Sequence, residues 1–314
     1  MNSHATLLGL DIGGSKTRAV LTRGAEVVNE VTVGTANLAS VGAEGVGLAL
    51  DDLIAHLARG QVDAVCAGAA GADSVQSSAQ LRSLLEQRFP RAQVEVVHDT
   101  RIILAAAGLD AGIVLVSGTG SACWGRRESG EQARAGGWGY LLGDEGSGYA
   151  VARDAVRQAL GEVDAGAEPS SLSRHLTAAC GLDEPWQLLQ AFYATPERAH
   201  WARRSAVVFD LAHRGDQTCR DIVGRAAGSL AELILDVGRR LRLRGPVVLA
   251  GGLAVHQPML VDGVRRRLGT EQLPDVHVLS EQPVLGALRL AGRMLAEPVL
   301  AGVSGLKPPQ RSRP

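Results

Sequence analysis

The stretch from Leu7 to Leu21 constrains the chain most, because its pattern predicts a strand, a tight turn and a second strand. Apolar residues from Leu7 to Ile12 favour a buried strand, and a second apolar run ends at Leu21. The residues left to reverse the chain are Gly13, Gly14, Ser15 and Lys16. Paired glycines let a backbone approach a ligand closely or adopt a positive φ, and a run of inward amides binds anions such as polyphosphate. The turn is therefore a candidate phosphate-binding hairpin.

Asp11 stands at the entrance of this turn. A carboxylate there could hold a magnesium ion, directly or through water, against bound phosphates. These residues alone also allow an ordinary Gly-Gly hairpin with an exposed Asp and Lys. Two other phosphate loops are excluded, because Ser15 stands where a Walker A loop requires Lys and no complete G-x-G-x-x-G occurs at the turn.

With 314 residues and 46% hydrophobic side chains, the chain is long enough for about two domains with proper cores. Its formal net charge of -1 offers no general attraction to nucleic acid or to an anionic membrane, so an anionic ligand has to be gripped locally. The four cysteines are scattered, and neither they nor the histidines have metal-ligand spacing. Because no signal peptide and no run of about 18 apolar residues is present, a cytoplasmic location is expected.

Asn37 lies in a segment, Gly34 to Gly42, that the composition predicts to be a polar loop. Its side-chain amide is a candidate ligand contact. Helical spacing is predicted only afterwards, from Val46 to Leu57.

Asp99 comes after a predicted strand, Val94 to Val97. Open α/β sheets place their ligands at the carboxyl ends of parallel strands, so the position favours a functional carboxylate. Asp is also a common N-cap, and Asp99 could instead only cap a helix from Arg101 to Ala107. The residues leave both interpretations open.

The strand, turn, strand plan is repeated from Ile113 onward. A strand from Ile113 to Val116 leads into a turn of small residues, which are Ser117, Gly118, Thr119, Gly120 and Ser121. Two such units suggest two similar halves that grip one polyphosphate from both sides. The hydroxyls of Thr119 and Ser121 are expected to add donors to the backbone amides.

The segment from Gly136 to Val156, GGWGYLLGDEGSGYAVARDAV, combines many glycines with an aromatic residue and two acids. Bare backbone and an acid such as Asp144 can hydrogen-bond a polyhydroxylated ligand, while Trp138 offers an apolar face to a sugar ring or fixes the loop. The alternative is a helix N-terminus with Asp144 or Glu145 close to its dipole.

The remainder of the chain is predicted to be mostly helical from Leu172 to Arg244, without site chemistry. A final buried strand, Val247 to Ala250, ends in Gly251 and Gly252, where a flat purine could lie against backbone. Helices are expected from Gln257 to Leu268 and from Pro283 to Leu295, followed by a Pro- and Arg-rich tail.

Taken together, four motifs resemble the actin-like ATPase superfamily of sugar kinases, specifically the N-acetylglucosamine kinase branch of the BadF/BadG/BcrA/BcrD-type ATPase family. LDIGGSKT is similar to the family's phosphate-1 loop, VSGTGS to its phosphate-2 loop and LAGGL to its adenosine motif. GGWGYLLGDEGS is the most specific of the four. The resemblance covers about Leu7 to Leu295.

The resemblance implies an α/β fold of two actin-like (ribonuclease H-like) domains, each a mixed five-stranded sheet flanked by helices, with the active site in the cleft between them. It implies an N-terminal lobe of residues 1–110 and a C-terminal lobe of residues 111–298 with a helical insertion near 169–215. The last helix could pack back on the N-terminal lobe, and residues 299–314 would form a flexible tail. The family's dimers also make a homodimer plausible.

The resemblance also implies roles for single residues. Asp99 matches the catalytic base and Asp11 the residue near magnesium. The nucleotide contacts would be Gly13, Gly14, Ser15, Lys16, Thr17, Gly118, Thr119, Gly120, Ser121, Gly251 and Gly252. The sugar contacts would be Asn37, Asp99, Thr119, Gly137, Trp138, Gly139 and Asp144.

The implied activity is ATP- and Mg²⁺-dependent phosphorylation of an amino-sugar hydroxyl, in the first place the 6-hydroxyl of N-acetylglucosamine. Ala122 replaces an Asn that helps to hold the sugar in the animal enzymes, so glucosamine, N-acetylmuramic acid and glucose stay open as substrates. Other classes are an ATPase activator of iron–sulfur dehydratases, which would need clustered cysteines, and a non-catalytic sugar sensor. A repressor of the related ROK group is disfavoured, because the first strand begins within a few residues of Met1.

Overall fold

The computed structural model describes residues 5–57, 60–72, 74–269, 273 and 275–295. By its internal contacts the chain divides into two compact units. Unit 1 consists of Met1–Asp110 with Leu279–Pro314, and unit 2 is Ala111–Val278. The expected tail, residues 299–314, lies outside the described residues. The assignment of residues 169–215 as an insertion stays a prediction.

Unit 1 is built on a five-stranded sheet in the order β3-β2-β1-β4-β5. Its strands are β1 (Thr6–Ile12), β2 (Lys16–Arg23), β3 (Glu26–Gly34), β4 (Ala64–Ala69) and β5 (Gln93–His98). The first three strands form an antiparallel meander, and β4 and β5 run parallel to β1. Because successive side chains of a strand point to opposite faces, Leu8, Leu10 and Ile12 pack into one layer and Leu7 into the other.

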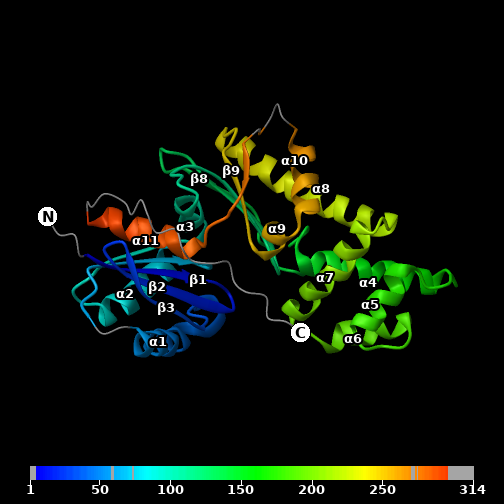
Figure 1. Ribbon diagram of the computed structural model, residues 1–314, viewed down its shortest axis with the longest axis horizontal. Helices are drawn as coiled ribbons and strands as arrows, with labels where there is room; N and C mark the ends of the chain where they lie inside the picture. Colours follow the sequence, from blue (N-terminus) through cyan, green and yellow to red (C-terminus); the bar gives the residue numbers. More distant parts are fainter. Residues whose placement is uncertain (1–4, 58–59, 73, 270–272, 274, 296–314) are drawn as a thin grey trace. The chain divides into compact units, whose positions relative to one another are not determined.

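Helices cover both faces of this sheet (Figure 1). The helices are α1 (Leu38–His56), α2 (Val75–Arg88), α3 (Asp99–Ala106) and α11 (Pro283–Met294). Helices α1 and α2 bury leucines against the face of Leu8, while α3 and α11 pack on the opposite face. The predicted polar loop, Gly34 to Gly42, is too long. Residues 35–37 form a loop, but the helix already begins at Leu38 and kinks at Gly42, where φ is 66°.

Unit 2 repeats the same connectivity in a second five-stranded sheet, β10-β9-β6-β7-β8. Its strands are β6 (Gly112–Ser117), β7 (Ser121–Arg126), β8 (Gln132–Gly136), β9 (Val247–Ala250) and β10 (Val276–Val278). Again three antiparallel strands are followed by two parallel ones. The predicted fold class, two mixed five-stranded sheets flanked by helices, is therefore confirmed.

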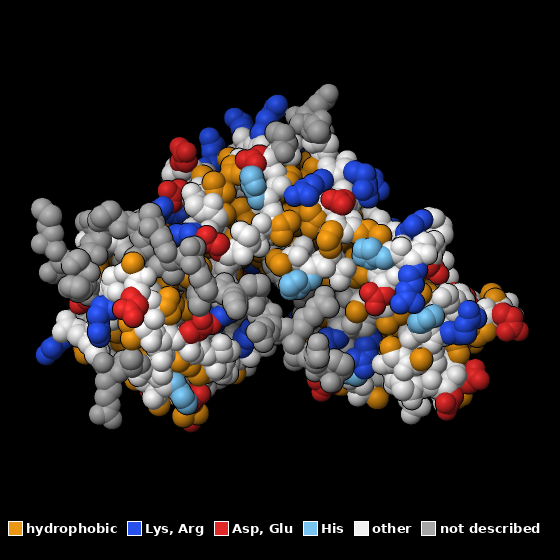
Figure 2. Space-filling model, in the orientation of Figure 1, with side chains coloured by type: hydrophobic (Ala, Val, Ile, Leu, Met, Phe, Trp, Pro, Cys, Tyr) orange, Lys and Arg blue, Asp and Glu red, His pale blue; other side chains and the backbone are white. Residues whose placement is uncertain are grey.

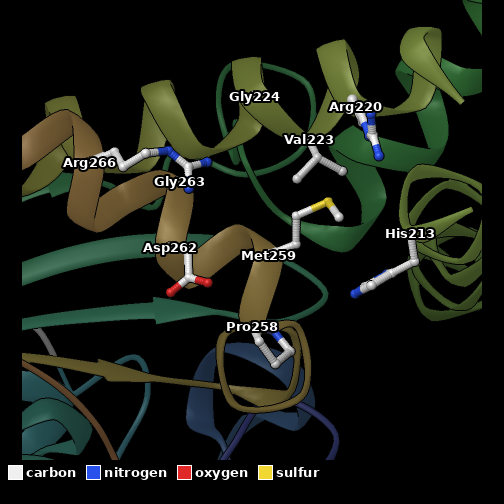
Figure 3. Close-up of a pocket in the computed structure, with 9 residues that line it drawn as sticks. All are labelled: His213, Arg220, Val223, Gly224, Pro258, Met259, Asp262, Gly263 and Arg266. Atoms are coloured by element: carbon white, nitrogen blue, oxygen red, sulfur yellow. The ribbon is translucent and has the colours of Figure 1, made fainter. Parts of the chain in front are cut away.

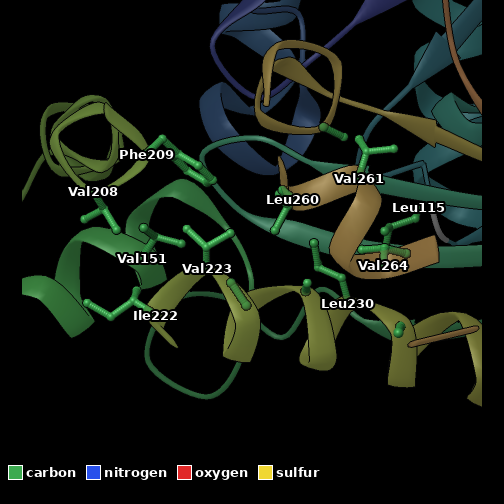
Figure 4. Close-up of a cluster of buried hydrophobic side chains, with 14 of the residues drawn as sticks. Leu115, Val151, Val208, Phe209, Ile222, Val223, Leu230, Leu260, Val261 and Val264 are labelled. Atoms are coloured by element: carbon green, nitrogen blue, oxygen red, sulfur yellow. The ribbon is translucent and has the colours of Figure 1, made fainter. Parts of the chain in front are cut away.

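Seven α-helices lie in the described part of unit 2 beside a short 3-10 helix, Pro185–Gln187. They are α4 (Gly148–Asp164), α5 (Ser171–Ala179), α6 (Leu188–Ala194), α7 (Arg198–His213), α8 (Gln217–Leu241), α9 (Gly252–His256) and α10 (Pro258–Leu268). The long helix α8 turns its buried stripe, which includes Ile222 and Leu230, toward a core shared with α7 and α10 (Figure 4). The expected helix from Gln257 begins at Pro258, since proline favours the first helical position.

Charges of both signs are distributed over the face shown in Figure 2, with a denser group of basic side chains over α8 and α10. Arg265 and Asp262 on α10 illustrate the mixture, since they form an ion pair at 3.6 Å. None of the helices in the described ranges combines the length and apolar character needed to cross a membrane.

Gly286 on α11 marks the closest approach between this helix and α3. A Cβ atom at residue 286 would lie 1.8 Å from the carbonyl oxygen of Ile102 and 2.6 Å from the amide nitrogen of Ala106. Gly292, on the same helix, is different, because a Cβ there would meet only Leu7 Cδ1 at an ordinary 3.5 Å. Glycine is therefore required sterically at 286 and not at 292.

We predict opposite effects for alanine at these two glycines. Gly286→Ala should lower the free energy of unfolding by about 2 kcal/mol or more, because backbone atoms of α3 cannot yield as a flexible side chain would. Gly292→Ala should be neutral or stabilising by up to about 1 kcal/mol, since alanine is the better helix former. Urea denaturation of both variants measures the difference. Equal destabilisation would contradict the packing described for α11.

Candidate active site

The first hairpin turns through Gly13–Ser15 between β1 and β2. The amide of Gly13 donates to the carbonyl of Lys16 at 3.0 Å, which closes the turn. Neither Gly13 nor Gly14 has a positive φ, and a Cβ at Gly14 would have no atom within 4 Å. The glycine pair is therefore not explained by a left-handed backbone. The structure instead supports the other explanation, that the missing side chains leave space for a ligand to approach the backbone.

Asp11 and Asp99 lie at the same edge of the unit 1 sheet, where β1 and β5 end. Asp11 is paired with Gly68 of β4, which is paired in turn with Val97 of β5, and the side chain of Ile102 packs over Gly68. Burial, and after it the negative charge of Asp99, raise the pKa of Asp11 to about 6 against the opposing effects of Lys16 and Arg18. The edge therefore holds two acids in an unfavourable arrangement that a cation would relieve.

Asp99 is the first residue of α3, but it does not cap the helix. His98 is the N-cap, because its Nδ1 accepts the amide of Thr100 at 3.3 Å. The alternative of Asp99 as a mere N-cap is therefore wrong. Nδ1 of His98 lies 3.0 Å from Asp99 Oδ1, and the two form an ion pair when the imidazole is protonated. Among the described residues, Oδ1 is buried without a hydrogen-bond partner.

Asn37 is buried, at 6% exposure, and its side chain is held on both sides. Its Oδ1 accepts the amide of Ala39 at 2.9 Å as the N-cap of α1, and its Nδ2 donates to the carbonyl of Ala70 at 2.6 Å. The side chain thus joins the start of α1 to the small-residue segment after β4. One amide proton and one lone pair stay available for a ligand.

The second hairpin turns between β6 and β7, and it is hydrogen-bonded to the loop Gly136–Ser147. Ser117 donates its hydroxyl proton to the carbonyl of Gly146 at 3.1 Å, and Ser121 donates to the carbonyl of Glu145 at 2.8 Å. The amide of Gly148 donates to the carbonyl of Gly118 at 2.8 Å. Because the Ser121 hydroxyl proton is used in this way, a contact of Ser121 with a phosphate would have to come from its backbone amide. Thr119 is exposed at the tip.

Asp144 has a left-handed backbone with φ of 60° and is only 6% exposed. Its carboxylate lies against Gly120, where a Cβ would approach Asp144 Oδ2 to 2.8 Å. The helix that follows is capped by Ser147, whose hydroxyl accepts the amide of Ala150. Ser147 and not Asp144 therefore caps this helix, and the alternative that Asp144 or Glu145 only lies near the helix dipole stays open. A strained, buried acid beside such a turn is typical of functional sites.

Trp138 does not belong to the core, since 66% of it is exposed. The guanidinium of Arg134 lies 4.9 Å from its ring centroid and donates to the carbonyls of Gly136 and Gly137 at 3.1 and 2.9 Å. Arg134, Trp138 and Asp144 also line a hollow of about 610 Å³ in front of α8. Arg134 therefore stacks against the Trp138 ring while most of the residue stays exposed. Gly139 has φ of 81° and no atom within 4 Å of its Cβ position.

Gly251 and Gly252 connect β9 to α9 beside the second hairpin. Gly251 has φ of 89°, and a Cβ there would lie 2.4 Å from the carbonyl oxygen of Ser117. Only glycine fits this close approach. Shortly after the turn, Pro258 and Met259 line a cavity of about 470 Å³, in which Met259 faces Val223 of α8 (Figure 3).

The structure brings the predicted residues together in two groups. Unit 1 holds Asp11, Gly13, Gly14, Ser15, Lys16, Thr17, Asn37 and Asp99, and unit 2 holds Gly118, Thr119, Gly120, Ser121, Gly137, Trp138, Gly139, Asp144, Gly251 and Gly252. The sequence did not predict that Thr35, Arg134 and Ser117 would hold these groups in place through hydrogen bonds. Of the three residues, only Ser117 lies inside a recognised motif, so only its role could have been suspected from the sequence.

Two sheets of the same connectivity, each with a small-residue hairpin at the edge where its parallel strands end, define an α/β protein of the actin-like ATPase class. The profile of the BadF/BadG/BcrA/BcrD ATPase family matches residues 8–291, and the chain belongs to this family.

Similar proteins are found among characterised sequences and solved structures. An N-acetylmuramic acid/N-acetylglucosamine kinase from Clostridium acetobutylicum is 31% identical over 287 residues, which are 87% of this chain and 93% of that protein. An N-acetyl-D-glucosamine kinase from Dictyostelium discoideum is 28% identical and covers 92% of this chain and 98% of its own length. A crystal structure from Chromobacterium violaceum, described as a candidate N-acetylglucosamine kinase, has a TM-score of 0.70 at 25% identity and covers 92% and 99% of the two chains.

We predict that Asp11→Asn stabilises the ligand-free protein above about pH 6. The folded pKa of about 6 lies above the ordinary value of 3.8, so the folded chain keeps a proton between these values that the unfolded chain has lost. The free energy of unfolding therefore falls as pH rises through this window, by no more than about 3 kcal/mol. Denaturant titrations from pH 4 to 8 should show this fall in the wild type and not in Asp11→Asn. A variant less stable than the wild type at pH 7.5 would contradict the charge arrangement.

Proposed function

We propose that the chain is an ATP-dependent kinase that phosphorylates a hydroxyl of an amino sugar, in the first place the 6-hydroxyl of N-acetylglucosamine. One observation carries the proposal. Asp99 places a buried carboxylate oxygen without a hydrogen-bond partner among the described residues at the sheet edge that also carries the Gly13–Lys16 turn. An unpartnered carboxylate oxygen is a ready proton acceptor.

The two hairpins are proposed to bind the phosphates of ATP. In unit 1 the proposed donors for phosphate oxygens are the amides of the exposed residues Gly14, Ser15 and Lys16. In unit 2 they are the amides of the turn around the exposed Thr119, where the amide of Gly118 already donates to the carbonyl of Gly120 at 2.9 Å. Phosphoryl transfer needs mainly alignment and neutralisation of charge, which such donors and Lys16 supply.

Magnesium fits the acids of unit 1. Mg²⁺ on a nucleotide is usually held by one or two carboxylates together with waters and phosphate oxygens, so a complete protein cage is not expected. Accordingly, the described residues contain no cluster of three or more acidic, His or Cys ligands. Asp11 would hold the ion directly or through water, and the charge of Asp99, which raises the pKa of Asp11, favours a cation there. The bound ion would neutralise charge on the phosphates.

The adenosine is proposed to lie against Gly251 and Gly252 and to extend into the cavity of Figure 3. Met259 and Val223 would contact the flat faces of the base. His213 and Arg220 reach toward the same space, and the Nδ1 of His213 is tied to the carbonyl of Phe209 at 2.7 Å, so its Nε2 is left as an acceptor for an exocyclic amine.

The sugar is proposed to contact Asn37 and Asp99 of unit 1, and Thr119, Gly137, Trp138, Gly139 and Asp144 of unit 2. Asp99 accepts the proton of the attacking hydroxyl while the bond from the γ-phosphorus to ADP breaks. The relatives named above act on N-acetylglucosamine or on both it and N-acetylmuramic acid by their descriptions, which supports an N-acetylated amino sugar. Ala122 lies directly behind Gly137, and glucosamine, N-acetylmuramic acid and glucose stay alternative substrates.

Two other functions are less well supported. An iron–sulfur activator needs accessible clustered cysteines, whereas Cys66, Cys123 and Cys219 are buried. No feature of the described residues favours a non-catalytic sugar sensor over a kinase. A cytoplasmic location, a homodimer and the lobe assignment stay predictions.

A coupled ADP-release screen tests the proposal directly. The purified chain is incubated with ATP and Mg²⁺ and with N-acetylglucosamine, N-acetylmuramic acid, glucosamine, glucose or no sugar. We expect sugar-dependent ADP release that is greatest for N-acetylglucosamine. Sugar binding without ADP release would identify a sensor, and release that no sugar stimulates would reject the kinase.

We predict that Asp99→Asn binds the sugar but turns over about 10² to 10⁴ times more slowly, because the amide cannot accept the hydroxyl proton. His98→Asn is a useful companion, since Asn can also cap α3 and leaves the carboxylate in place. Initial rates and calorimetric sugar binding measure both variants. Turnover by Asp99→Asn within a few-fold of the wild type would reject the assigned base.

A further inference from the structure

We propose that Thr17 and Ser121 are positioning residues that tie each phosphate hairpin to the sugar-contacting segment of its own unit, so that binding of one substrate strengthens binding of the other. The inference rests on the proposed function, because it assigns the nucleotide to the hairpins and the sugar to the segments around Asn37 and Asp144. It gives both side chains a role other than contact with the nucleotide.

In unit 1, the hairpin is tied to residues 35–37 through two hydroxyl groups. Thr17 is fully buried, with 0% exposure, and its hydroxyl accepts a hydrogen bond from the amide of Ala36 at 2.8 Å. Thr35 donates its hydroxyl proton to the carbonyl of Gly13 at 2.6 Å and accepts the amide of Asn37 at 3.0 Å. The backbone amides of Ala36 and Asn37, which lead into the proposed sugar contact, are therefore hydrogen-bonded to the turn directly or through Thr35.

In unit 2, an equivalent tie is made at the equivalent place. Ser121 is the first residue of β7, and Thr17 is the first buried residue of β2, so the two lie at equivalent positions after their turns. Ser121 is 4% exposed. Its hydroxyl donates to the carbonyl of Glu145, next to Asp144, and its own carbonyl accepts the amide of Gly137 at 3.1 Å. One residue thus holds both ends of the proposed sugar loop.

These ties make the two substrates interdependent by simple thermodynamics. A nucleotide that orders a hairpin also orders the segment bonded to it, so the sugar loses less conformational freedom when it binds second. The same coupling free energy acts in the opposite direction, from sugar to nucleotide. A small displacement of a sugar contact also costs turnover, because transfer depends on alignment.

The chain offers closely matched variants for a test. Thr17→Val keeps the side-chain shape and removes the acceptor, whereas Thr17→Ser keeps the hydroxyl. Thr22 lies on the same strand, is also 0% exposed and has a hydroxyl without a hydrogen-bond partner among the described residues, so Thr22→Val is the control. For Ser121→Ala the control is Ser173→Ala, which removes a buried hydroxyl that donates to Glu162 in the same unit.

Calorimetry measures the dissociation constant of N-acetylglucosamine with and without saturating AMP-PNP and Mg²⁺. We expect AMP-PNP to tighten sugar binding at least about fivefold in the wild type, Thr17→Ser and both controls. In Thr17→Val and Ser121→Ala the ratio should fall to within about twofold of one, and kcat should fall about 10- to 100-fold, with AMP-PNP affinity in the absence of sugar retained.

Two results would overturn the inference, and neither is a failure of the proposed function. In the first, the wild type phosphorylates the sugar but AMP-PNP does not tighten its sugar binding. In the second, Thr17→Val and Ser121→Ala both show the same tightening of sugar binding by AMP-PNP as the wild type. Thermal melting excludes loss of fold as the cause, and if Thr17→Val does not fold, Ser121→Ala decides alone. A wild type that phosphorylates none of the sugars would instead reject the kinase assignment.

Discussion

Each sheet has its phosphate-type turn at the edge where its parallel strands end, and this constraint organises both units. In unit 1 the register aligns Ile12 with Ala69 and Ala69 with His98, so the hairpin turn, the small residues after β4 and the acid after β5 emerge together. In unit 2 the pairing of Val116 with Ala250 brings the second hairpin beside the Gly251 turn in the same way. The antiparallel start and the parallel continuation of each sheet thus deliver donors and acids to a common edge.

The charges at the unit 1 edge oppose the stability of the ligand-free fold. The carboxylate of Asp11 is desolvated and faces the charge of Asp99, and the resulting rise in its pKa means that keeping Asp11 ionised at neutral pH costs folding free energy. The left-handed backbone of Asp144 adds strain of roughly 1 kcal/mol in unit 2. Proteins retain such unfavourable features where a ligand relieves them.

Much of the fold could be predicted from local patterns. The apolar runs around Leu8 and Leu115 and the helical stripe of α8 determine which faces are buried, so most strands and the duplicated plan could be predicted. The short strands β8 and β10 were not predicted. The start of α1 was missed because Gly42 and its neighbours have loop-like composition, while the helix forms through the cap at Asn37. The low helix propensity of these residues is overcome by the cap, in which the amide of Ala39 donates a hydrogen bond to the Asn37 side chain.

The site was less predictable than the fold, because its supporting bonds join residues that are distant in sequence. The LDIGGSKT string indicates a phosphate hairpin, but nothing in it shows that Thr17 bonds Ala36 rather than a nucleotide, since that bond depends on how β3 returns alongside β2. The same holds for Ser121 and Glu145, which are brought together only by the return of the chain after β8. The sequence motif therefore indicates which backbone segment could contact the ligand. In both hairpins the buried hydroxyl inside the motif, on Thr17 or Ser121, is instead hydrogen-bonded to neighbouring backbone. Under the proposed function, the direct donors to the phosphates would consequently be backbone amides of the two turns.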